Sequence, residues 1–274
     1  MTESINITGI TAPLTVIFTP PDAQSYIVTV NGLTATFSVV APIIIPPSPA
    51  PPPITSGNKK IALVDYHYHN DTVANADMTA ILTAKPDILI DCTPGSLWKG
   101  GTLPPKYASA NIRVFSYITG GYEGTKYKTS EDNLTTNISR IDAIANDKAT
   151  GVFIDEVTFA PDAQGKAYLA ALCNEAHIRG LLVILNIGDN FYDDWLYTVA
   201  DYICSNEAYG GSKPSTSESG FLARTIVLDL NPTATALSAI SITKAAQANG
   251  YGWCYVTDGY NALPTWLSTY MAGI

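Results

Sequence analysis

Charged residues are scarce in this 274-residue chain, and basic residues are the scarcer kind. Asp, Glu, Lys and Arg together make up 14% of the sequence, only 15 residues are Lys or Arg, and the net charge at pH 7 is −9. With 46% hydrophobic residues, the chain is not an extended disordered polyelectrolyte. No basic run occurs, which argues against nucleic acid as a partner, because phosphate binding needs clustered Lys and Arg. A neutral or cationic polymer suits an acidic surface better.

Long apolar runs are also missing. The longest near the start, APIIIPP at residues 41–47, is far too short to span a bilayer. Residues 1–20 have neither the basic segment nor the apolar segment of a secretory signal. We therefore predict no membrane span and expect an extracellular or virion-associated location without such a signal.

Cysteine and histidine are too few for the common metal sites. The four cysteines are scattered in apolar runs without any C-x-x-C, which is typical of buried free thiols. Asp65, His67 and His69 could open a metal site, but the later strand ends that would complete it carry Asn186 and Glu207. No nucleotide-binding glycine turn and no G-x-S-x-G occur either. The sequence predicts no metal and no cofactor.

A proline run, PPSPAPPP at residues 46–53, divides the chain. Strand-like segments precede it, the last two joined by Asn31-Gly32 as in a β-hairpin. We predict a small β-strand module at residues 1–45, a Pro-rich linker at 46–58 and one domain at 59–274. Because so short a module buries little core and leaves strand edges unpaired, we expect residues 1–53 to mediate a homo-oligomer or a higher assembly.

Residues 59–274 alternate between apolar runs and helical segments. Eight runs read as buried parallel strands, namely KIALVDYHY, DILIDC, IRVFSYIT, GVFIDEV, LLVILNIG, DYICSNEA, RTIVLDL and YGWCYVTD. Gly180 and Gly250 end two of the helical segments just before the next strand. Eight such units predict an α/β fold of the (β/α)₈ TIM-barrel class, with a doubly wound open sheet as the alternative.

Polar and aromatic residues end nearly every predicted strand. In a TIM barrel these ends meet at one face, where active sites lie. Acids and amides beside flat aromatic rings suit a sugar, whose hydroxyls form hydrogen bonds and whose apolar faces stack. We predict the following substrate-binding residues: Asp65, His67, Asp91, Tyr117, Tyr122, Asn186, Tyr209 and Asp258.

Asp155 and Glu156 end the fourth predicted strand, GVFID, as an adjacent pair of acids. Side chains alternate along a strand, so the two acids cannot play the same part. Strand six is the next-but-one neighbour and ends near Glu207, within reach for a catalytic carboxylate pair in glycoside hydrolysis. We predict Asp155 and Glu207 as the central catalytic pair and Glu156 as a third catalytic acid. The plainer alternative is that Asp155 caps a loop and Glu156 pairs with a nearby cation.

Three segments resemble the spherulin-like glycoside hydrolases, that is, glycoside hydrolase family 135 and the related polygalactosaminidases of family 114. They are VFSYITGGYEGTKY, GVFIDEV and VILNIGDNFYDDWLYTVADYICSNEAY. The resemblance covers most of residues 60–210 and implies a (β/α)₈ barrel that cleaves polymers of galactosamine and N-acetylgalactosamine. It also implies that Asp155, Glu156 and Glu207 are the key acids. The chain differs at Ile187, where the family has proline, at Asp91 and in the DYHYH segment.

Two functional hypotheses follow. The first is an endo-acting glycoside hydrolase for a galactosamine-type polysaccharide, carried on a small module that docks it into an assembly. The second is a structural subunit of a virion, filament or tube whose barrel binds glycans weakly or not at all. An open cleft that holds both Asp155 and Glu207 favours the enzyme.

Overall fold

The computed structural model describes residues 3–7, 24–30, 33–39, 58–65, 71–91, 105–120, 122–123, 126–127, 133–157, 161–188, 193–211, 220–259 and 262–274. In 3–39, 71–76, 105–106 and 122–127 the description covers the backbone only. The chain divides into two compact units, residues 1–46 and 47–274. The predicted proline linker, 46–58, lies outside the described residues except for Asn58.

The first unit contains a three-stranded sheet in the order β1 (Glu3–Ile7), β2 (Gln24–Val30) and β3 (Leu33–Val39). Strands β2 and β3 are antiparallel and pair up to Val30 and Leu33, as the predicted hairpin requires. Strand β1 runs parallel to β2. A parallel neighbour cannot be joined by a tight turn, so the connection between β1 and β2 is long.

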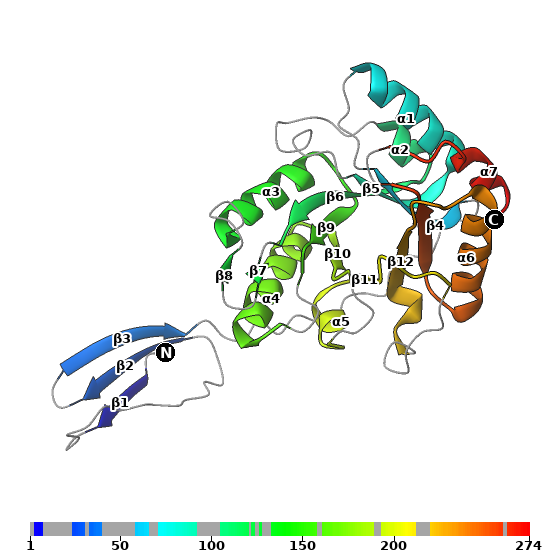
Figure 1. Ribbon diagram of the computed structural model, residues 1–274. Helices are drawn as coiled ribbons and strands as arrows, with labels where there is room; N and C mark the ends of the chain where they lie inside the picture. The colour runs from blue at the N-terminus through cyan, green and yellow to red at the C-terminus, as the bar shows by residue number, and fades with distance from the viewer. Residues whose placement is uncertain are drawn as a thin grey trace. The chain divides into compact units, whose positions relative to one another are not determined.

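The second unit is a closed barrel of eight parallel strands (Figure 1). Its strands are β4 (Lys59–Asp65), β5 (Pro86–Asp91), β6 (Arg113–Thr119), β9 (Gly151–Asp155), β10 (Leu182–Asn186), β11 (Tyr202–Ser205), β12 (Thr225–Leu230) and β13 (Trp253–Thr257). They follow each other around the barrel in chain order, and β13 closes on β4. All eight strands coincide with the predicted apolar runs. The chain therefore has a (β/α)₈ TIM barrel, and the open-sheet alternative is wrong.

Helices between the strands cover the outside of the barrel (Figure 1). They are α1 (Asp71–Ala84), α2 (Pro105–Ser109), α3 (Leu134–Asn146), α4 (Ala163–Ile178), α5 (Leu196–Val199), α6 (Ala236–Asn249) and α7 (Leu267–Ala272), with a 3₁₀ turn at η2 (Leu222–Arg224). Two short strands, β7 (Tyr122–Glu123) and β8 (Lys126–Tyr127), pair between β6 and α3. Gly180 (φ 75°) and Gly250 (φ 96°) take the left-handed conformation at helix ends, as predicted. None of the described helices is long and apolar enough to cross a bilayer.

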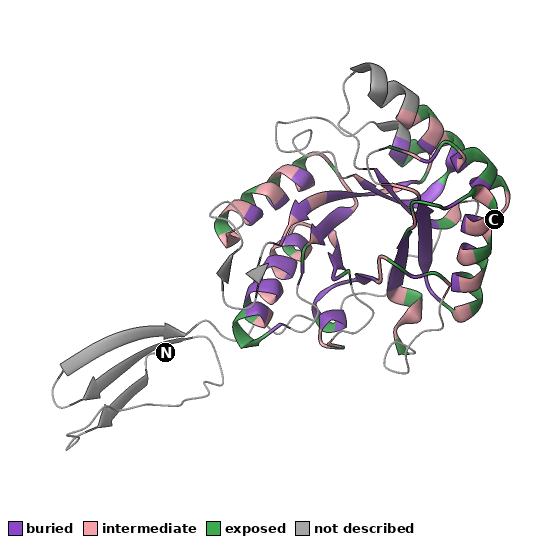
Figure 2. Ribbon diagram, viewed as in Figure 1, coloured by how far each residue is buried: buried purple, intermediate pink, exposed green. Residues whose placement is uncertain are grey.

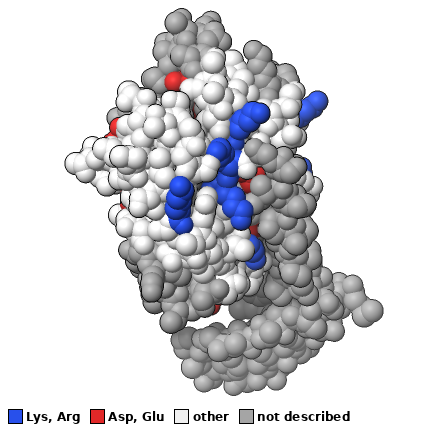
Figure 3. All heavy atoms as spheres, turned by 90° about the vertical axis from the view of Figure 1, so that its right-hand side faces the viewer, with Lys and Arg blue, Asp and Glu red and all other residues white. Residues whose placement is uncertain are grey.

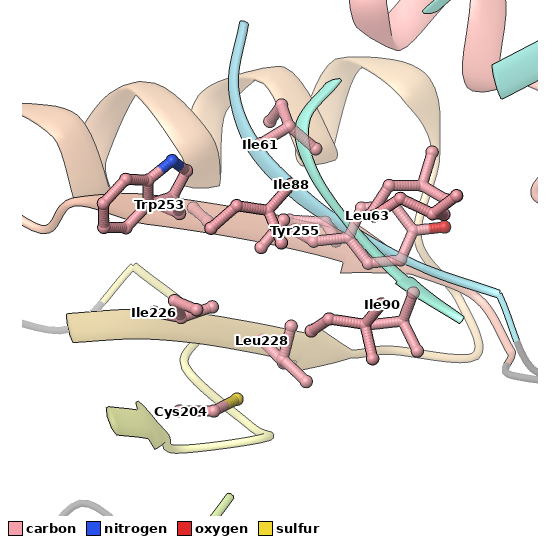
Figure 4. Close-up of a cluster of buried hydrophobic side chains, with 14 of the residues drawn as sticks. Ile61, Leu63, Ile88, Ile90, Cys204, Ile226, Leu228, Trp253 and Tyr255 are labelled. Carbon is pink, nitrogen blue, oxygen red and sulfur yellow. The ribbon is translucent and has the colours of Figure 1, made fainter. Parts of the chain in front are cut away.

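Strand register separates an inner and an outer face of the barrel wall, because laterally paired residues share a face and successive residues alternate. Phe115 of β6 makes an edge-to-face contact with Tyr202 of β11, three strands away, so both rings lie inside the barrel. Cys254 contacts Thr243 of α6, so Cys254 faces outward. The wall is buried on both faces (Figure 2), and Figure 4 shows part of this core, where β4, β5, β11, β12 and β13 meet.

The N-terminal end of the barrel is closed by a charged cluster. Arg113 forms two hydrogen bonds to Asp87, of 2.6 and 3.2 Å, and a third of 2.9 Å to the Tyr202 hydroxyl. The indole N–H of Trp253 donates to the same Asp87 carboxylate at 2.7 Å. The guanidinium also lies over the rings of Tyr202 and Trp253. These groups satisfy one another, so the cluster is a structural floor.

Charge is not spread evenly over the surface. Figure 3 shows Lys and Arg side chains grouped over the face that carries α6 and α7, with few acids among the described residues in that view. The net charge of the chain is nevertheless −9.

Candidate active site

The C-terminal ends of β9, β10 and β11 bring together Asp155, Asn186 and Glu207. The amide nitrogen Nδ2 of Asn186 donates to Asp155 Oδ1 at 2.6 Å and to Glu207 Oε1 at 2.9 Å. Because both carboxylate oxygens bond to the same nitrogen atom, they lie no more than about 5.5 Å from each other. Glu156 is the other predicted catalytic acid, and it follows Asp155 directly.

Left-handed residues turn the chain at each of these three strand ends. They are Glu156 after β9 (φ 57°), Gly188 after β10 (φ 61°) and Asn206 after β11 (φ 56°). Alternation alone would place Glu207 on the outer face with Ser205. The left-handed turn at Asn206 breaks the alternation, and the Glu207 side chain reaches Asn186, whose side chain is on the inner face. Non-glycine residues in this conformation are uncommon and concentrate at functional sites.

Asp155 is partly buried and surrounded by neutral donors. Its Oδ1 accepts the backbone N–H of Glu156 at 2.8 Å as well as the Asn186 amide, and its carboxyl is also bonded to Tyr117. Burial raises the pKa of the Asp155 carboxyl, although these hydrogen bonds oppose the rise. The nearby negative charge of Glu156 adds to the rise.

Glu156 differs from the other two acids because it is exposed. Its Oε2 accepts a hydrogen bond of 3.3 Å from the Thr119 hydroxyl at the end of β6. Thr119 pairs in register with Asp155 and was not among the predicted residues. The signal that could have found Thr119 is its position, two residues after Tyr117 on the same face of β6. The predicted distinction between Asp155 and Glu156 agrees with this geometry.

Beneath the carboxylates lies Cys204, on the inner face of β11 and paired with Asn186. It is fully buried, and burial raises the pKa of its thiol well above the usual range. The charges of Glu207 and Asp155 raise it further. The thiol therefore stays protonated and forms an apolar floor for the site.

Two predicted residues, Asp65 and Asp91, lie on the other side of the barrel wall. They pair with each other, and Asp91 also pairs with Ser116, the outer-face neighbour of Phe115 and Tyr117. Asp65 is only 2% exposed. The pKa of Tyr107, on the outer helix α2, is raised mainly by burial, and the charges of Asp91 and Asp65 raise it further. The structure does not bring Asp65 and Asp91 to Asp155 and Glu207, because strand alternation turns them toward the helices.

Tyr209, which was predicted to contact the substrate, is a buried side chain in the structure. Tyr209 is 1% exposed, packs edge-to-face on Tyr251 and accepts a hydrogen bond from Asn249 of α6. It fills space between β12 and α6. Asp258 follows β13 and accepts the indole N–H of Trp266 at 3.1 Å. His67 lies outside the described residues, and of Tyr122 only the backbone, in β7, is described.

Comparison with known proteins identifies a fold. No protein-family model matches the sequence, and no curated protein matches it either. Among solved structures the chain is similar to Aspergillus clavatus Sph3 in complex with GalNAc, with 15% identity, a TM-score of 0.57 and coverage of 78% of this chain and 97% of that one. It is also similar to a fungal endo-beta-N-acetylglucosaminidase from glycosyl hydrolase family 18, with 15% identity, a TM-score of 0.54 and coverage of 79% and 98%. The chain has a TIM-barrel fold that glycoside hydrolases share.

Other features of this TIM barrel lie away from the carboxylates. A cavity of about 670 Å³ lies between α1 and α7, lined by residues such as Asp77, Thr83 and Met271. None of the three strand-end acids lines it. In the part of the chain that the structure describes, no group of three or more His, Cys, Asp or Glu is placed to hold a metal ion. Among the described residues, Asp155, Asn186 and Glu207 form an arrangement at the strand ends that is suited to acid–base chemistry.

Proposed function

We propose that this protein is a glycoside hydrolase and that Asp155 and Glu207 are its catalytic pair. The observation that carries the proposal is the single amide nitrogen of Asn186, which bonds to both carboxylates and so holds the bonded oxygens within about 5.5 Å of each other. Retaining glycosidases separate their two carboxyl groups by about 5–5.5 Å, whereas inverting enzymes need roughly 6.5–9.5 Å. The spacing thus favours hydrolysis with retention at the anomeric carbon.

The hydrogen bonds divide the roles of the two acids. Asp155 Oδ1 accepts two N–H donors, which require an acceptor, and these bonds favour the carboxylate against the rise in the pKa of Asp155 that burial causes. We assign Asp155 as the nucleophile and Glu207 as the general acid and base. Asp155 attacks the anomeric carbon, the glycosidic C–O bond breaks, and Glu207 gives its proton to the leaving oxygen. Water then attacks the same carbon, Glu207 takes the proton from the water, and the bond to Asp155 breaks.

A galactosamine or N-acetylgalactosamine polymer is the proposed substrate. The motif resemblance to families 135 and 114 supports it, as does the likeness to a structure that binds GalNAc. Glu156 is exposed beside the catalytic pair, so it is placed to contact the bound polymer. An acidic chain also suits a partly deacetylated, cationic polymer.

Incubation with galactosaminogalactan, with chitosan and chitin as comparison polymers, tests the proposed function. We expect soluble oligosaccharides from the galactosamine polymer, measured as reducing ends and by mass spectrometry. The control is Glu207→Gln, which keeps the shape of the side chain and removes the acid. If the unmutated protein releases nothing from any hexosamine polymer, the hydrolase proposal is wrong and the structural-subunit hypothesis stands.

We further propose that residues 1–53 attach the barrel to an extracellular or virion-associated assembly. The three-stranded sheet is small, and a sheet of three strands needs a hydrophobic face covered to be stable. Light scattering on the full chain should give a mass above that of one 29.2 kDa chain. A chain that is monomeric at all concentrations tested would contradict self-assembly through this module.

A further inference from the structure

Asn186 was predicted to bind the sugar, but its side-chain donors are already in use. The amide nitrogen has two N–H groups, and each is donated to a carboxylate, one to Asp155 and one to Glu207. The amide oxygen accepts the backbone N–H of Gly188 at 3.2 Å. Asn186 is also 3% exposed. This amide therefore has no N–H left to offer a substrate hydroxyl.

The surroundings of Asn186 fix which way its amide points. Its backbone oxygen accepts the N–H of Val157, which ties the end of β10 to the loop after β9. The left-handed turn at Gly188 brings a backbone N–H onto the amide oxygen, so the NH₂ group must face the two acids. A flipped amide would place its oxygen against two carboxylates and its NH₂ against an N–H donor.

We propose that Asn186 is a positioning residue that couples the two catalytic carboxyl groups: through one nitrogen atom it sets their spacing and donates an N–H to each. This inference rests on the proposed function for its kinetic consequence, but not for its electrostatic one. A neutral donor stabilises the ionised form of each acid it touches. When one acid is protonated or reoriented, the amide shifts toward the other, so the two groups titrate as a pair.

Other groups around the pair constrain the effect. Tyr117 of β6 bonds to Asp155, Glu156 of β9 adds negative charge, and the buried thiol of Cys204 lies below. Among the described residues, no Lys or Arg side chain forms an ion pair with Asp155 or Glu207. The amide of Asn186 is therefore the one described group that donates to both acids.

Carbon-13 NMR titration of the Asp and Glu carboxyl groups tests the coupling without any substrate. Assignment uses Asp155→Asn and Glu207→Gln. Replacing the amide by an apolar group of similar shape, Asn186→Leu, should raise the apparent pKa of both carboxyls by about one pH unit or more, because each loses a donor to its charged form. As a single substitution, Glu207→Gln should also shift the titration of Asp155. When it is combined with Asn186→Leu, this shift should be smaller.

Two further variants keep the test decisive. Asn186→Asp has the same shape and should fold even where Leu does not, and its added negative charge should raise both pKa values further. The matched control is Asn249→Leu, which removes an amide of α6 that donates to Tyr209, and it should leave both titrations unchanged. If only one carboxyl responds to Asn186→Leu and Asn186→Asp, or neither does, the coupling role is overturned.

The kinetic readout separates this inference from the proposed function. If the protein hydrolyses galactosaminogalactan, both limbs of the pH profile of kcat/KM should move to higher pH in Asn186→Leu. A purely structural role would lower the rate and leave the profile in place. If no polymer is cleaved, the proposed function fails, but the titration still decides whether Asn186 couples the two acids.

Discussion

The barrel holds two polar clusters, one at each end, and they differ in how charge is compensated. At the N-terminal end, the Asp87 carboxylate is neutralised by the guanidinium of Arg113 and capped by Trp253. At the C-terminal end, Asp155 and Glu207 share a neutral amide, and burial raises the pKa of Asp155. A compensated pair favours one rigid arrangement, whereas an uncompensated carboxyl pair keeps protons and nucleophilic oxygens available. The difference agrees with a structural role for the N-terminal cluster and with the catalytic role proposed for the C-terminal one.

Removing a carboxylate at the C-terminal end should have the largest effect. Asp155→Asn and Glu207→Gln should each lower kcat/KM on the polymer by roughly 10³- to 10⁴-fold, because nucleophile and proton donor act in the transition state. Thermal unfolding should show no loss of stability in either variant. A loss of stability with activity retained would place these acids with the structural cluster.

Azide rescue then separates the roles of the two acids. With 4-nitrophenyl glycosides of short galactosamine oligomers, azide added to Glu207→Ala should give a glycosyl azide of retained configuration. With Asp155→Ala it should give the inverted azide, since azide then replaces the nucleophile itself. Products with these configurations exchanged would reverse the assignment.

Breaking the compensated pair should have the opposite signature. Asp87→Asn leaves the Arg113 guanidinium, on a side chain that is only 14% exposed, without its counter-charge, so we expect the free energy of unfolding to fall by about 3 kcal/mol. In a chain of this size that corresponds to a drop in Tm of roughly 10 °C, with kcat unchanged. The control is Asp142→Asn, which removes the exposed partner of Arg179 and should cost less than about 0.5 kcal/mol.

The stability of the site should depend on pH in a direction set by the raised pKa of Asp155. Below its ordinary value of 3.8 the carboxyl is neutral whether the chain is folded or unfolded. As the pH rises through the raised value, ionisation in the fold is disfavoured and stability is lost. Asp155→Asn should therefore show little gain in Tm near pH 3.8 and a growing gain toward neutral pH.

Asp193 provides a control of opposite sign. Its pKa is lowered mainly by its hydrogen bond with Lys166, so its contribution to stability is present above the ordinary value and lost as the pH falls. Asp193→Asn should lose a little Tm at neutral pH and none at acidic pH. A parallel response of Asp155→Asn and Asp193→Asn would contradict the sign argued for Asp155.

The sequence predicted the barrel well because its signal is periodic and repeated. Each of eight apolar runs is short, buried on both faces and followed by polar residues, and the closed order of the strands follows from their number. The pair of Asp155 and Glu207 was also predictable, since a strand end is a fixed place in such a barrel. Alternation, applied to strand four, correctly separated Asp155 from Glu156.

The position of other predicted site residues depends on features that alternation within one strand does not give. Asp65 and Asp91 lie on the same face of the barrel wall as Ser116, opposite to Tyr117. Predicting this face needs the register between neighbouring strands, which the sequence alone does not give. Tyr209 is buried under α6 because its loop turns back along β12, as the pairing of Ala208 with Asp229 records. Left-handed turns such as that at Asn206 override alternation, and no propensity of the residue types alone predicts them.

A matched pair of tyrosines gives the finest comparison between the two clusters. Tyr202→Phe removes the hydroxyl that accepts from Arg113, and Tyr117→Phe removes the hydroxyl bonded to Asp155. We expect Tyr202→Phe to lower stability by about 1 kcal/mol and to leave kcat/KM unchanged. Tyr117→Phe should lower kcat/KM by about tenfold and raise the pKa of the acid limb of the kcat/KM profile, because the Asp155 carboxylate loses a hydrogen-bond donor that stabilises its ionised form. Its Tm should be unchanged. Equal losses of stability in the two variants, without a change in rate, would mean that both ends of the barrel are structural.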